Sequence, residues 1–417
     1  MRPRPRHVFA WAATLFVLTA QFFRFPSPLR DLDGRFLDEF QLLLPWGYLL
    51  TMPFSAVADM VTFNSARQDA VLIAYLLLGY WLWRWYRDRP IKVFYPKESL
   101  GSKTLHEIVS YAVYLLGVAA FLSWAMLLSR PAAKLLSSHP DDLIVDFHSH
   151  TKHSWDGRKS FTPEKNMAWH RKTGFHAAFI TDHNKIEGAQ AAAELSKRNK
   201  DGFKALMGEE LSLFDSHIAV LGNKTFIDPK HYGNGLDGVY RLLSEAQKYG
   251  GSAIMSSPEF WAKHPQKRWE EFAKAGALGF EVVNAAPKGL DFPPALKQEL
   301  ILLCKKRNLA LLGATDNHGW GWAAYVWNAT RIKGHQFMDA AKLERAVMEK
   351  LRKDRFSAVR IVTRVKREPQ SGVRLCLDPF EGLWTTARTF TFVQVLLCIF
   401  WFWLPGLLRD LSREIFD

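Results

Sequence analysis

Cysteine is scarce in this chain. The cysteines are Cys304, Cys376 and Cys398, and no two of them have the close spacing of a paired motif. Disulfide-stapled scaffolds and thiolate zinc sites both depend on closely paired cysteines. The sequence therefore indicates neither kind of site, and cysteine usage leaves the cellular compartment open.

Signs of a nucleic-acid partner are also missing. Basic residues exceed acidic ones, 55 to 41, which gives a net charge of +14 and a pI of about 9.6. This charge permits attraction to anionic lipid or to an anionic substrate. The basic run at residues 342–367 has helical spacing as far as Lys353 and no accompanying aromatic pattern. It favours a solvated face near the membrane, so we expect no specific nucleic-acid partner.

Apolar sequence, in contrast, is abundant. The 417 residues exceed the ~250 to 300 at which single cores stop growing, so we expect one catalytic-sized domain and a further part. The composition is 14% aromatic yet 23% charged, a mixture typical of membrane spans joined to a polar domain.

Two stretches are the clearest predicted transmembrane helices. Residues 108–128 carry no formal charge and are long enough to cross a ~30 Å hydrocarbon core at ~1.5 Å per residue. Residues 389–408 are also uncharged, interrupted by Gln394 and Pro405 and flanked by arginines. We predict that both segments span a membrane.

Three further apolar segments lie nearer the N-terminus. Residues 8–23 and 70–86 are predicted spans, although both are short. No small-residue cleavage site follows residues 8–23, which favours a retained anchor over a signal peptide. Residues 42–58 contain two prolines, so this segment either spans as a kinked helix or lies at the interface. The membrane region, residues 1–135, is therefore expected to hold three or four spans.

The short loop at residues 84–103 indicates the orientation. It carries six basic residues and two acidic ones, and such loops prefer the cytoplasm. Residues 108–128 would then lead outward. We therefore predict an integral protein of a bacterial inner membrane, with the soluble domain on the extracytoplasmic side.

The soluble domain is predicted at residues 139–367. No internal repeat or low-complexity tract occurs in it. Strand-like runs at 143–147, 177–181, 252–255, 279–284 and 309–314 alternate with helix-like segments at 163–173, 188–200, 237–249 and 294–307. Repeated β-then-α order predicts a largely parallel sheet or barrel.

Metal-binding types of side chain follow three of these strands. They are His148, His150 and Asp156 after the first strand, His183 after the second, and Asp316 and His318 after the last. In a parallel barrel these strand ends meet on one face. The two imidazoles of a His-x-His pair point the same way on an extended strand and can hold one ion. Glu210 and His217 add a carboxylate and a histidine from adjacent strands.

These residues, in this order, resemble the PHP family, the polymerase and histidinol phosphatase superfamily. The resemblance covers about residues 142–330, including the strand that starts near Glu281. It implies an α/β fold, a distorted (β/α)7 barrel, here with α-helical transmembrane segments before and after it. It also implies two or three divalent metal ions, and the nitrogen and oxygen donors suit Mn, Zn or Fe.

The resemblance also assigns the ligands. One metal would be held by His148, His150, Glu210 and Asp316, and a second by Asp156, His183 and His318. Glu210 would bridge to a third ion that His217 also binds. At this third position the chain departs from the family, because Ser257 stands where a histidine is expected. The third ion would then be weakly held or absent, or His264 would complete its set of ligands.

Other polar residues near these motifs receive lesser roles. Asp146 and Asp182 are expected to orient the neighbouring histidines by accepting their second N–H. A candidate phosphate clamp consists of Arg158, Lys159 and Lys185. The alternative is that these three residues are solvated surface charges. Residues not expected to be ligands are His153, His170, His176 and Glu209, and Cys304 is read as a core residue.

The predicted activity is metal-dependent hydrolysis of a phosphoester by a membrane-anchored domain. The eight ligands would be its catalytic residues, and its partners a phosphorylated small molecule or short nucleotide and the lipid bilayer. The alternative is a catalytically weak sensor that binds metal and ligand, for which Ser257 is the sign. A transporter is disfavoured because the two best spans contain no ionisable residue. The oligomeric state and the substrate within this class stay open.

Overall fold

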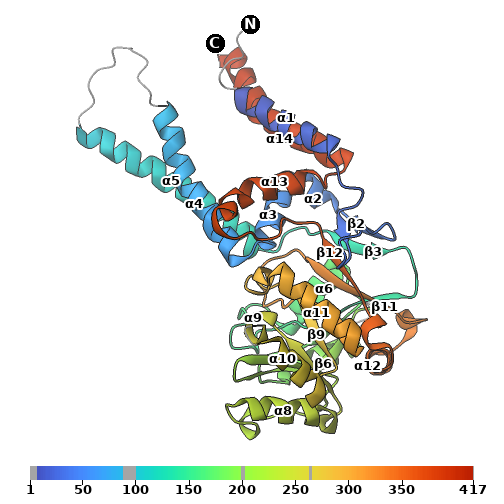
Figure 1. Cartoon of the computed structure of the whole chain (residues 1–417). Helices are drawn as coiled ribbons and strands as arrows, with labels where there is room; N and C mark the ends of the chain where they lie inside the picture. The colour runs from blue at the N-terminus through green and yellow to red at the C-terminus, as the bar shows by residue number, and fades with distance from the viewer. Residues whose placement is uncertain (1–6, 88–99, 199–201, 263–264, 417) are drawn as a thin grey trace.

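The computed structural model describes residues 7–87, 100–198, 202–262 and 265–416. It consists of a mixed α/β body and a group of long helices that leave the body at one end (Figure 1). The centre of the body is a ten-stranded sheet. Its strands lie in the order β1 (Leu29–Arg30), β12 (Arg360–Arg364), β11 (Val326–Arg331), β4 (Asp142–Asp146), β5 (Ala177–Ile180), β6 (Lys204–Leu213), β7 (Ser216–Leu221), β8 (Ser252–Ser256), β9 (Gly279–Asn284) and β10 (Ala310–Ala314).

The sheet is mixed, which corrects the expectation of a largely parallel one. The pairs β4–β5, β5–β6, β8–β9 and β9–β10 are parallel. β6 and β7 form an antiparallel hairpin, because Phe214 and Asp215 alone separate Leu213 from its partner Ser216. β7–β8 is also antiparallel, as are the pairs that add β11, β12 and β1 at one edge.

The sheet curls so that β4 and β10 approach each other at their carboxyl ends. A parallel bridge joins Ser149, just after β4, to Asn317, just after β10. The Asn328 side chain on β11 donates to the carbonyls of Val145 and Gly313 and so links β4 with β10. The curl therefore brings together segments about 170 residues apart in the sequence, both of which carry ligand-type side chains.

Seven α-helices cover the sheet. Their bounds are α6 (Pro163–Thr173), α7 (Glu187–Arg198), α8 (Leu236–Glu245), α9 (Pro258–Trp261), α10 (Gln266–Ala275), α11 (Pro294–Arg307) and α12 (Ala340–Asp354). α6 and α11 have the predicted bounds. In α6 the start follows from the Thr162 cap and Pro163, and the end from Gly174 in a left-handed conformation. α12 packs on the sheet through Leu343, Val347 and Leu351, with its charged face outward.

Short elements form a collar between the body and the long helices. The collar comprises β2 (Phe40–Leu43), α2 (Trp46–Leu50), α3 (Phe54–Thr62), β3 (Lys134–Ser137), which pairs with β2, and α13 (Asp378–Ala387). The undecided segment at residues 42–58 is thus a strand end and two short helices. None of these is long enough to cross a hydrocarbon core, so this segment does not supply a spanning helix.

A buried carboxylate fastens the collar to the body. Asp59 on α3 lies 2.7 Å from the Arg130 guanidinium and 2.6 Å from that of Arg364 on β12, and all three side chains are largely buried. The Tyr48 hydroxyl donates to the same carboxylate at 2.9 Å. The two guanidinium groups outweigh the desolvation cost and lower the pKa of Asp59. The collar is therefore held by charges that match only in this arrangement.

The long helices are α1 (Val8–Phe22), α4 (Ala66–Arg87), α5 (Leu100–Met126) and α14 (Phe392–Phe416). α4 and α5 are in contact, with the Tyr80 and Tyr111 rings 4.9 Å apart. α1 packs along α14, so the start of α1 and the end of α14 lie near the same tip (Figure 1). Among the described residues, two stretches are long and apolar enough to cross a membrane, Thr104–Met126 and Phe392–Ser412.

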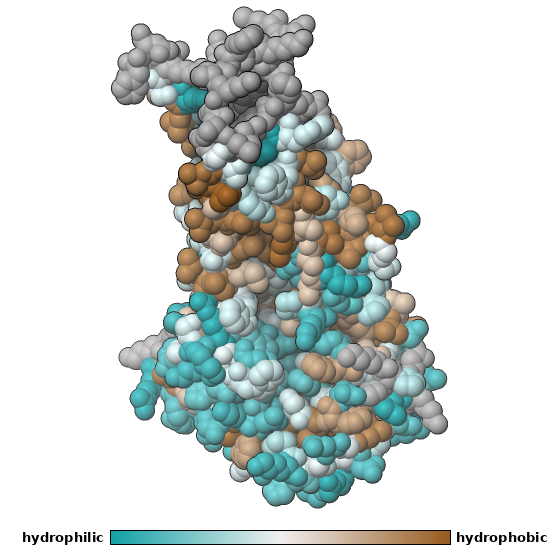
Figure 2. Space-filling model, turned by 90° about the vertical axis from the view of Figure 1, so that its left-hand side faces the viewer, coloured by the Kyte–Doolittle hydropathy of each residue, from teal (hydrophilic) through white to brown (hydrophobic). Residues whose placement is uncertain are grey.

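These two stretches overlap the two clearest predicted spans. α1 is a shorter apolar helix, and residues 70–86 lie in α4, which is not among the two. In a view turned by 90°, hydrophobic residues gather over the upper half of the molecule, at the level of the long helices, and hydrophilic ones over the body (Figure 2). Membrane association therefore rests on two helices, and the orientation stays a prediction.

Candidate metal centre

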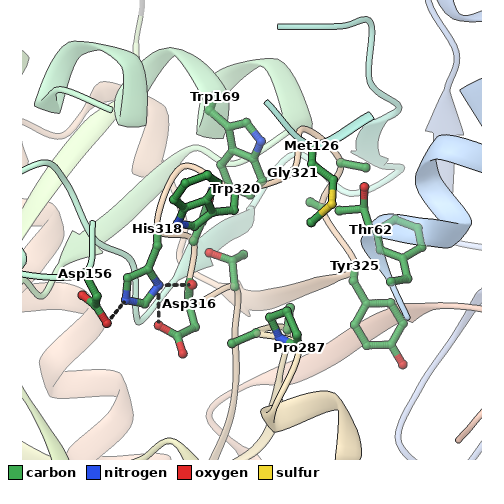
Figure 3. A pocket seen from close by; sticks show the side chains of 17 residues that line it. Thr62, Met126, Asp156, Trp169, Pro287, Asp316, His318, Trp320, Gly321 and Tyr325 are labelled. Carbon is green, nitrogen blue, oxygen red and sulfur yellow. Dashed lines mark hydrogen bonds and ion pairs between the residues drawn. The ribbon is translucent and has the colours of Figure 1, made fainter. Parts of the chain in front are cut away.

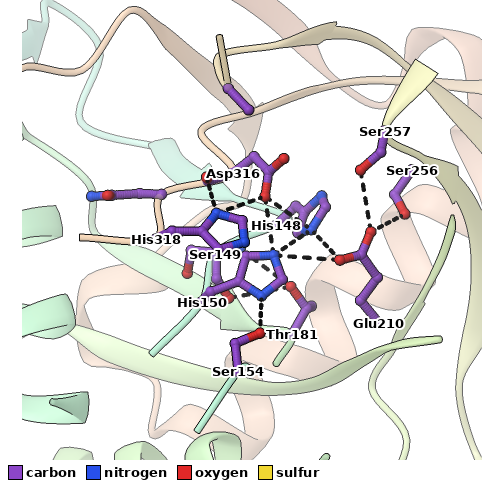
Figure 4. A network of polar contacts seen from close by, with 12 residues as sticks. His148, Ser149, His150, Ser154, Thr181, Glu210, Ser256, Ser257, Asp316 and His318 are labelled. Carbon is purple, nitrogen blue, oxygen red and sulfur yellow. Dashed lines mark hydrogen bonds and ion pairs between the residues drawn. The ribbon is translucent and has the colours of Figure 1, made fainter. Parts of the chain in front are cut away.

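The structure brings all eight predicted ligands into one buried cluster. His148 and His150 come from the end of β4, His183 follows β5, and Asp316 and His318 follow β10. Glu210 and His217 lie on the β6–β7 hairpin, and Asp156 is on the loop after β4. Figure 4 shows five of these side chains converging from different strands.

Four donor atoms form the tightest group. His148 Nε2 lies 2.9 Å from His150 Nε2 and 3.0 Å from Glu210 Oε2. Asp316 Oδ1 lies 3.0 Å from His150 Nε2 and 3.4 Å from His148 Nε2. Ligands at ~2.1 Å around a tetrahedral first-row ion stand ~3.4 Å apart, so this group is close to coordination spacing. The group is the set that the PHP resemblance assigns to the first ion.

Unsatisfied polar atoms at the same place favour a cation. Glu210 Oε2, Asp316 Oδ1, Asp156 Oδ1 and His318 Nε2 are buried and make no hydrogen bond of acceptable geometry with the described residues, although imidazole nitrogens lie 3.0 Å from both Glu210 Oε2 and Asp316 Oδ1. Buried polar atoms are normally paired, and an uncompensated one costs ~1 to 3 kcal/mol. A divalent cation would satisfy the oxygens and the imidazole nitrogen together, so the residues present fit a metal centre.

A second group contains Asp156, His183 and His318, as predicted. Asp156 Oδ2 lies 3.2 Å from His318 Nε2 and 3.4 Å from His183 Nε2. His150 stacks on His318 with ring centroids 3.9 Å apart, and the three histidines have nitrogen atoms within 4.8 Å of one another. His150 therefore stands between the first and second groups.

The third group is centred on Glu210. Its Oε1 lies 3.2 Å from His217 Nδ1, and its Oε2 lies 3.0 Å from His183 Nδ1. Ser256 and Ser257 donate to Oε1 at 2.7 and 3.3 Å. Ser257 thus faces the centre at the position where the PHP resemblance predicts a histidine, with a hydroxyl in place of an imidazole. His264 lies outside the described residues.

The backbone is strained at two of these positions. Asp316 has φ of +47° and Ser257 has φ of +53°, values in the left-handed region that non-glycine residues seldom adopt. Such conformations gather at functional sites, where the surrounding contacts hold them. Here the Asp316 N–H donates to the carbonyl of His148, and the Ser257 N–H donates to Glu281.

The partners that orient the histidines differ from those predicted. Asp146 accepts from the His170 ring at 2.9 Å and from the backbone N–H groups of His148 and Thr315. Asp182 accepts from the backbone and hydroxyl of Thr151. Both carboxylates hold loops in place and contact none of the ligand rings. The prediction was wrong because it paired residues close in sequence, whereas the two carboxylates bind His170, Thr315 and Thr151.

Three other groups orient the ligand rings. Glu281 Oε1 on β9 lies 2.8 Å from His148 Nδ1, and Ser154 Oγ lies 3.0 Å from His150 Nδ1. The carbonyl of Asp316 lies 2.8 Å from His318 Nδ1. Each contact directs the opposite ring nitrogen, Nε2, into the cluster. Glu281 is the glutamate of the Glu-Val-Val-Asn strand, and its place in this strand was the sequence signal that could have indicated its role.

Charge in the cluster favours a bound cation. Burial disfavours a charged imidazole, but the carboxylates of Glu210, Glu281 and Asp316 outweigh it and raise the pKa of His148. At His318 burial again disfavours the charged imidazole, but Asp316 and Asp156 outweigh this effect and raise the pKa to about 9. At His150 burial and the adjacent His318 dominate and lower the pKa to about 3. The carboxylates thus attract positive charge, which a proton or a metal ion can provide.

The candidate phosphate clamp is not assembled as a unit. The Arg158 guanidinium donates to the carbonyl of Leu127 and lies 5.7 Å above the Trp320 ring. Lys159 and Lys185 are exposed. A role for the two lysines stays a prediction, and Arg158 has a partner in the chain.

The residues not expected to be ligands lie outside the cluster. His170 pairs with Asp146, the His176 ring lies tilted beside that of His335, and His153 is half-buried. Glu209 points away from Glu210, accepts from the Ile227 N–H, and has a pKa raised by burial to about 8. Cys304 is buried in the core, as expected. Glu259, which no motif in the sequence indicated, has a pKa raised to about 8 by burial and by the negative charge of Asp316.

Comparisons with known proteins give partial likenesses. No family model matches the sequence, and no curated protein matches it. A metal-dependent phosphoesterase, so described, from Bifidobacterium adolescentis is 17% identical, with a TM-score of 0.34 over 42% of this chain and 87% of that one. An amidohydrolase from Chromobacterium violaceum, with bound sulfate and no metal, is 16% identical, with a TM-score of 0.31 over 42% and 87%. PsfC from Pseudomonas syringae is 15% identical, with a TM-score of 0.33 over 50% and 96%.

Proposed function

We propose that this chain is a membrane-anchored, metal-dependent phosphoesterase of the PHP type. The observation that carries the proposal is the convergence of His148, His150, Glu210 and Asp316 at coordination spacing. Two or three divalent ions, of Mn, Zn or Fe, would occupy these overlapping groups, among which three sets of three ligand atoms lie within 4.8 Å of one another.

The proposed barrel is of the distorted (β/α)7 type. It would consist of strands β4 to β10, which follow one another in the sheet in their sequence order. Its closure is supported by the bridge between Ser149 and Asn317 and by the hydrogen bonds of Asn328. The antiparallel β7 would be the distortion. The ligands would then lie at the carboxyl-end rim, the usual position of active sites in such barrels.

The chemistry divides between the ions and the chain. Divalent ions neutralise the charge of a phosphoester and lower the pKa of water toward ~7. Glu210 presents one oxygen to His148 and the other to His217, and so joins the first and third groups. Glu281 and Ser154 hold the rings of His148 and His150 in fixed orientations. Such prior orientation keeps donors and substrate in a reactive geometry.

Metal analysis coupled to a phosphoester panel tests the proposal. The full chain, purified in detergent and saturated with Mn, Zn or Fe, should bind two or three ions. It should hydrolyse p-nitrophenyl phosphate or its diester. A chain that binds no ion in saturating manganese would contradict the metal centre. Release of no phosphate with any metal and any ester would contradict the phosphoesterase.

A sensor is the second candidate function, and Ser257 favours it. Serine hydroxyls replace an imidazole beside Glu210, which weakens the third group as a metal site. A sensor would bind metal and a phosphorylated ligand with little turnover. Thermal stabilisation of the chain by a phosphoester that it does not cleave would support this alternative.

For location, we propose an inner-membrane protein with the metal centre outside the cytoplasm. Thr104–Met126 and Phe392–Ser412 would be its spans. The basic loop at residues 84–103, which would remain inside, supports this orientation.

A further inference from the structure

A cavity extends from the metal centre to the end of a long apolar helix. It has a volume of about 250 Å³. Asp156, Asp316 and His318 lie on one side, and Met126, the last residue of α5, lies on the other (Figure 3). Phe63 also lines the cavity. The polar and apolar sides therefore face one shared space.

The end of α5 is fastened directly to the loops that carry the ligands. The Gly321 N–H, three residues after His318, donates to the Met126 carbonyl at 2.8 Å. The Arg158 guanidinium, two residues after Asp156, donates to the carbonyl of Leu127. These contacts fix the apolar helix as a wall of the cavity, rather than as a neighbour that touches it loosely.

The start of α4 forms part of the same border. The Ala66 N–H donates to the carbonyl of Pro287, which lines the cavity, at 3.3 Å. Arg67 pairs with Asp291 at 2.9 Å. Both α4 and α5 thus meet the body at this cavity, and Figure 1 shows the two helices leaving the body together.

Apolar surface continues outward from the cavity. Trp320, which lines it, is 51% exposed, and Leu128, just beyond α5, is 54% exposed. An exposed tryptophan beside a membrane span is typical of the membrane–water interface. A ligand reaching this surface from the metal centre would have a charged end and an apolar end.

We propose that the substrate is an amphiphilic phosphomonoester taken from the bilayer surface. Its phosphate would lie at the metal centre and its apolar group along Phe63, Met126 and Trp320. This inference rests on the proposed phosphoesterase function. In the reaction a water oxygen bonds to phosphorus, the bond from phosphorus to the ester oxygen breaks, and that oxygen takes a proton from water. The products are a membrane-soluble alcohol and inorganic phosphate.

The test compares chain lengths with the full chain in phosphatidylcholine nanodiscs. Octyl phosphate, kept below its micellar concentration, should be hydrolysed with a kcat/KM at least tenfold above that of ethyl phosphate. A hexadecyl phosphate held in the same bilayer should also be cleaved. Equal kcat/KM for octyl and ethyl phosphate would overturn the apolar subsite. Cleavage of octyl phosphate without cleavage of the bilayer-held ester would overturn the membrane source.

Two variants test the cavity itself. Ala286→Trp fills it from the side of Pro287, and Met126→Glu makes its apolar wall charged. Each should lower the octyl-to-ethyl ratio of kcat/KM at least fivefold, whereas Leu302→Trp, on an exposed position of α11, should leave the ratio unchanged. Metal content identifies a misfolded variant. An unchanged ratio in a metal-loaded Ala286→Trp or Met126→Glu protein would overturn the inference.

The failure of this inference differs from failure of the proposed function. If no phosphoester of any length is hydrolysed, the phosphoesterase itself fails. If esters of all lengths are hydrolysed at similar rates, only the amphiphilic substrate fails.

Discussion

Each candidate metal-ligand side chain belongs to a group of imidazoles and carboxylates within ion-pair distance of one another. Removing one ligand therefore leaves the remaining donors without compensation and weakens the group. Asp316→Ala should lower kcat/KM at least 100-fold and release one ion per chain, measured by metal analysis of the purified protein. His148→Ala should do the same. Both variants should still be extracted from the membrane fraction only by detergent.

His153→Ala is the matched control, since this half-buried histidine lies outside the cluster. Activity within twofold of the starting protein is expected for it. Retained activity in Asp316→Ala or His148→Ala would contradict their assignment as ligands.

Ser257 tests the incomplete third group. Its hydroxyl lies 3.3 Å from Glu210, so a histidine there would add an imidazole beside His217. Ser257→His should raise the metal content by up to one ion per chain, measured by mass spectrometry of the digested metal. The exposed Ser160→His serves as the control for added imidazole. If both variants bind the same amount of metal, Ser257 is not at the deficient position.

Glu209 predicts a dependence of stability on pH. Burial raises its pKa from 4.5 to about 8, so the folded protein holds a proton that the unfolded chain releases. This contribution to stability is fully present below pH 4.5 and is lost as the pH rises through about 8. Glu209→Gln removes the titration. The melting temperature of the variant, relative to the starting protein, should therefore be several degrees higher at pH 9 than at pH 5.

Exposed Glu194→Gln is the control for that experiment. Its melting temperature should change equally at both pH values. If the melting temperatures of Glu209→Gln and the starting protein differ by the same amount at pH 5 and pH 9, Glu209 is charged at both pH values.

The ligand-type residues were predictable because they follow strands, and the ends of strands in one sheet meet. Their supporting contacts were not. His148 and Glu281 are 133 positions apart and meet only through the curl of the sheet. A local pattern contains no information on such a contact, which explains why Asp146 and Asp182 were chosen in its place.

Among the elements, the α/β alternation was the strongest guide. Helices with a cap and a terminal glycine, such as α6, were predictable to the residue. The β6–β7 hairpin and strand β11, which pairs with both β4 and β12, reverse direction within the sheet. Pairing direction depends on loops and on partners distant in sequence. The collar was not predictable either, since residues 42–58 have the composition of a span and are divided by prolines.

The collar elements depend on one buried charge. Asp59→Ala would leave Arg130 and Arg364 buried without their shared carboxylate, which costs roughly 3 to 5 kcal/mol. The melting temperature of the detergent-solubilised full chain should fall by well over 5 °C, followed by circular dichroism. Asp33→Ala, on an exposed turn, should change it little. Equal melting temperatures for the two variants would show that the collar does not stabilise the body.

At the scale of the whole molecule, the orientation can be tested with one introduced thiol. Cys304 and Cys398 are buried, whereas Cys376 is exposed and must be removed first. Lys159→Cys in a Cys376→Ser background should react with an impermeant maleimide in intact cells, because we propose that the body lies outside the cytoplasm. Labelling only after lysis would place the body in the cytoplasm.

The packing of α1 against α14 determines when the fold can be completed during synthesis. His7 stacks on Trp403, and Trp11 lies edge-on to the same ring, so the first helix packs against one made about 370 residues later. At ~5 to 20 residues per second, the ribosome needs roughly 20 to 70 s to produce that partner. The two ends therefore meet only after every intervening segment has left the ribosome, which makes their docking a late step of biogenesis.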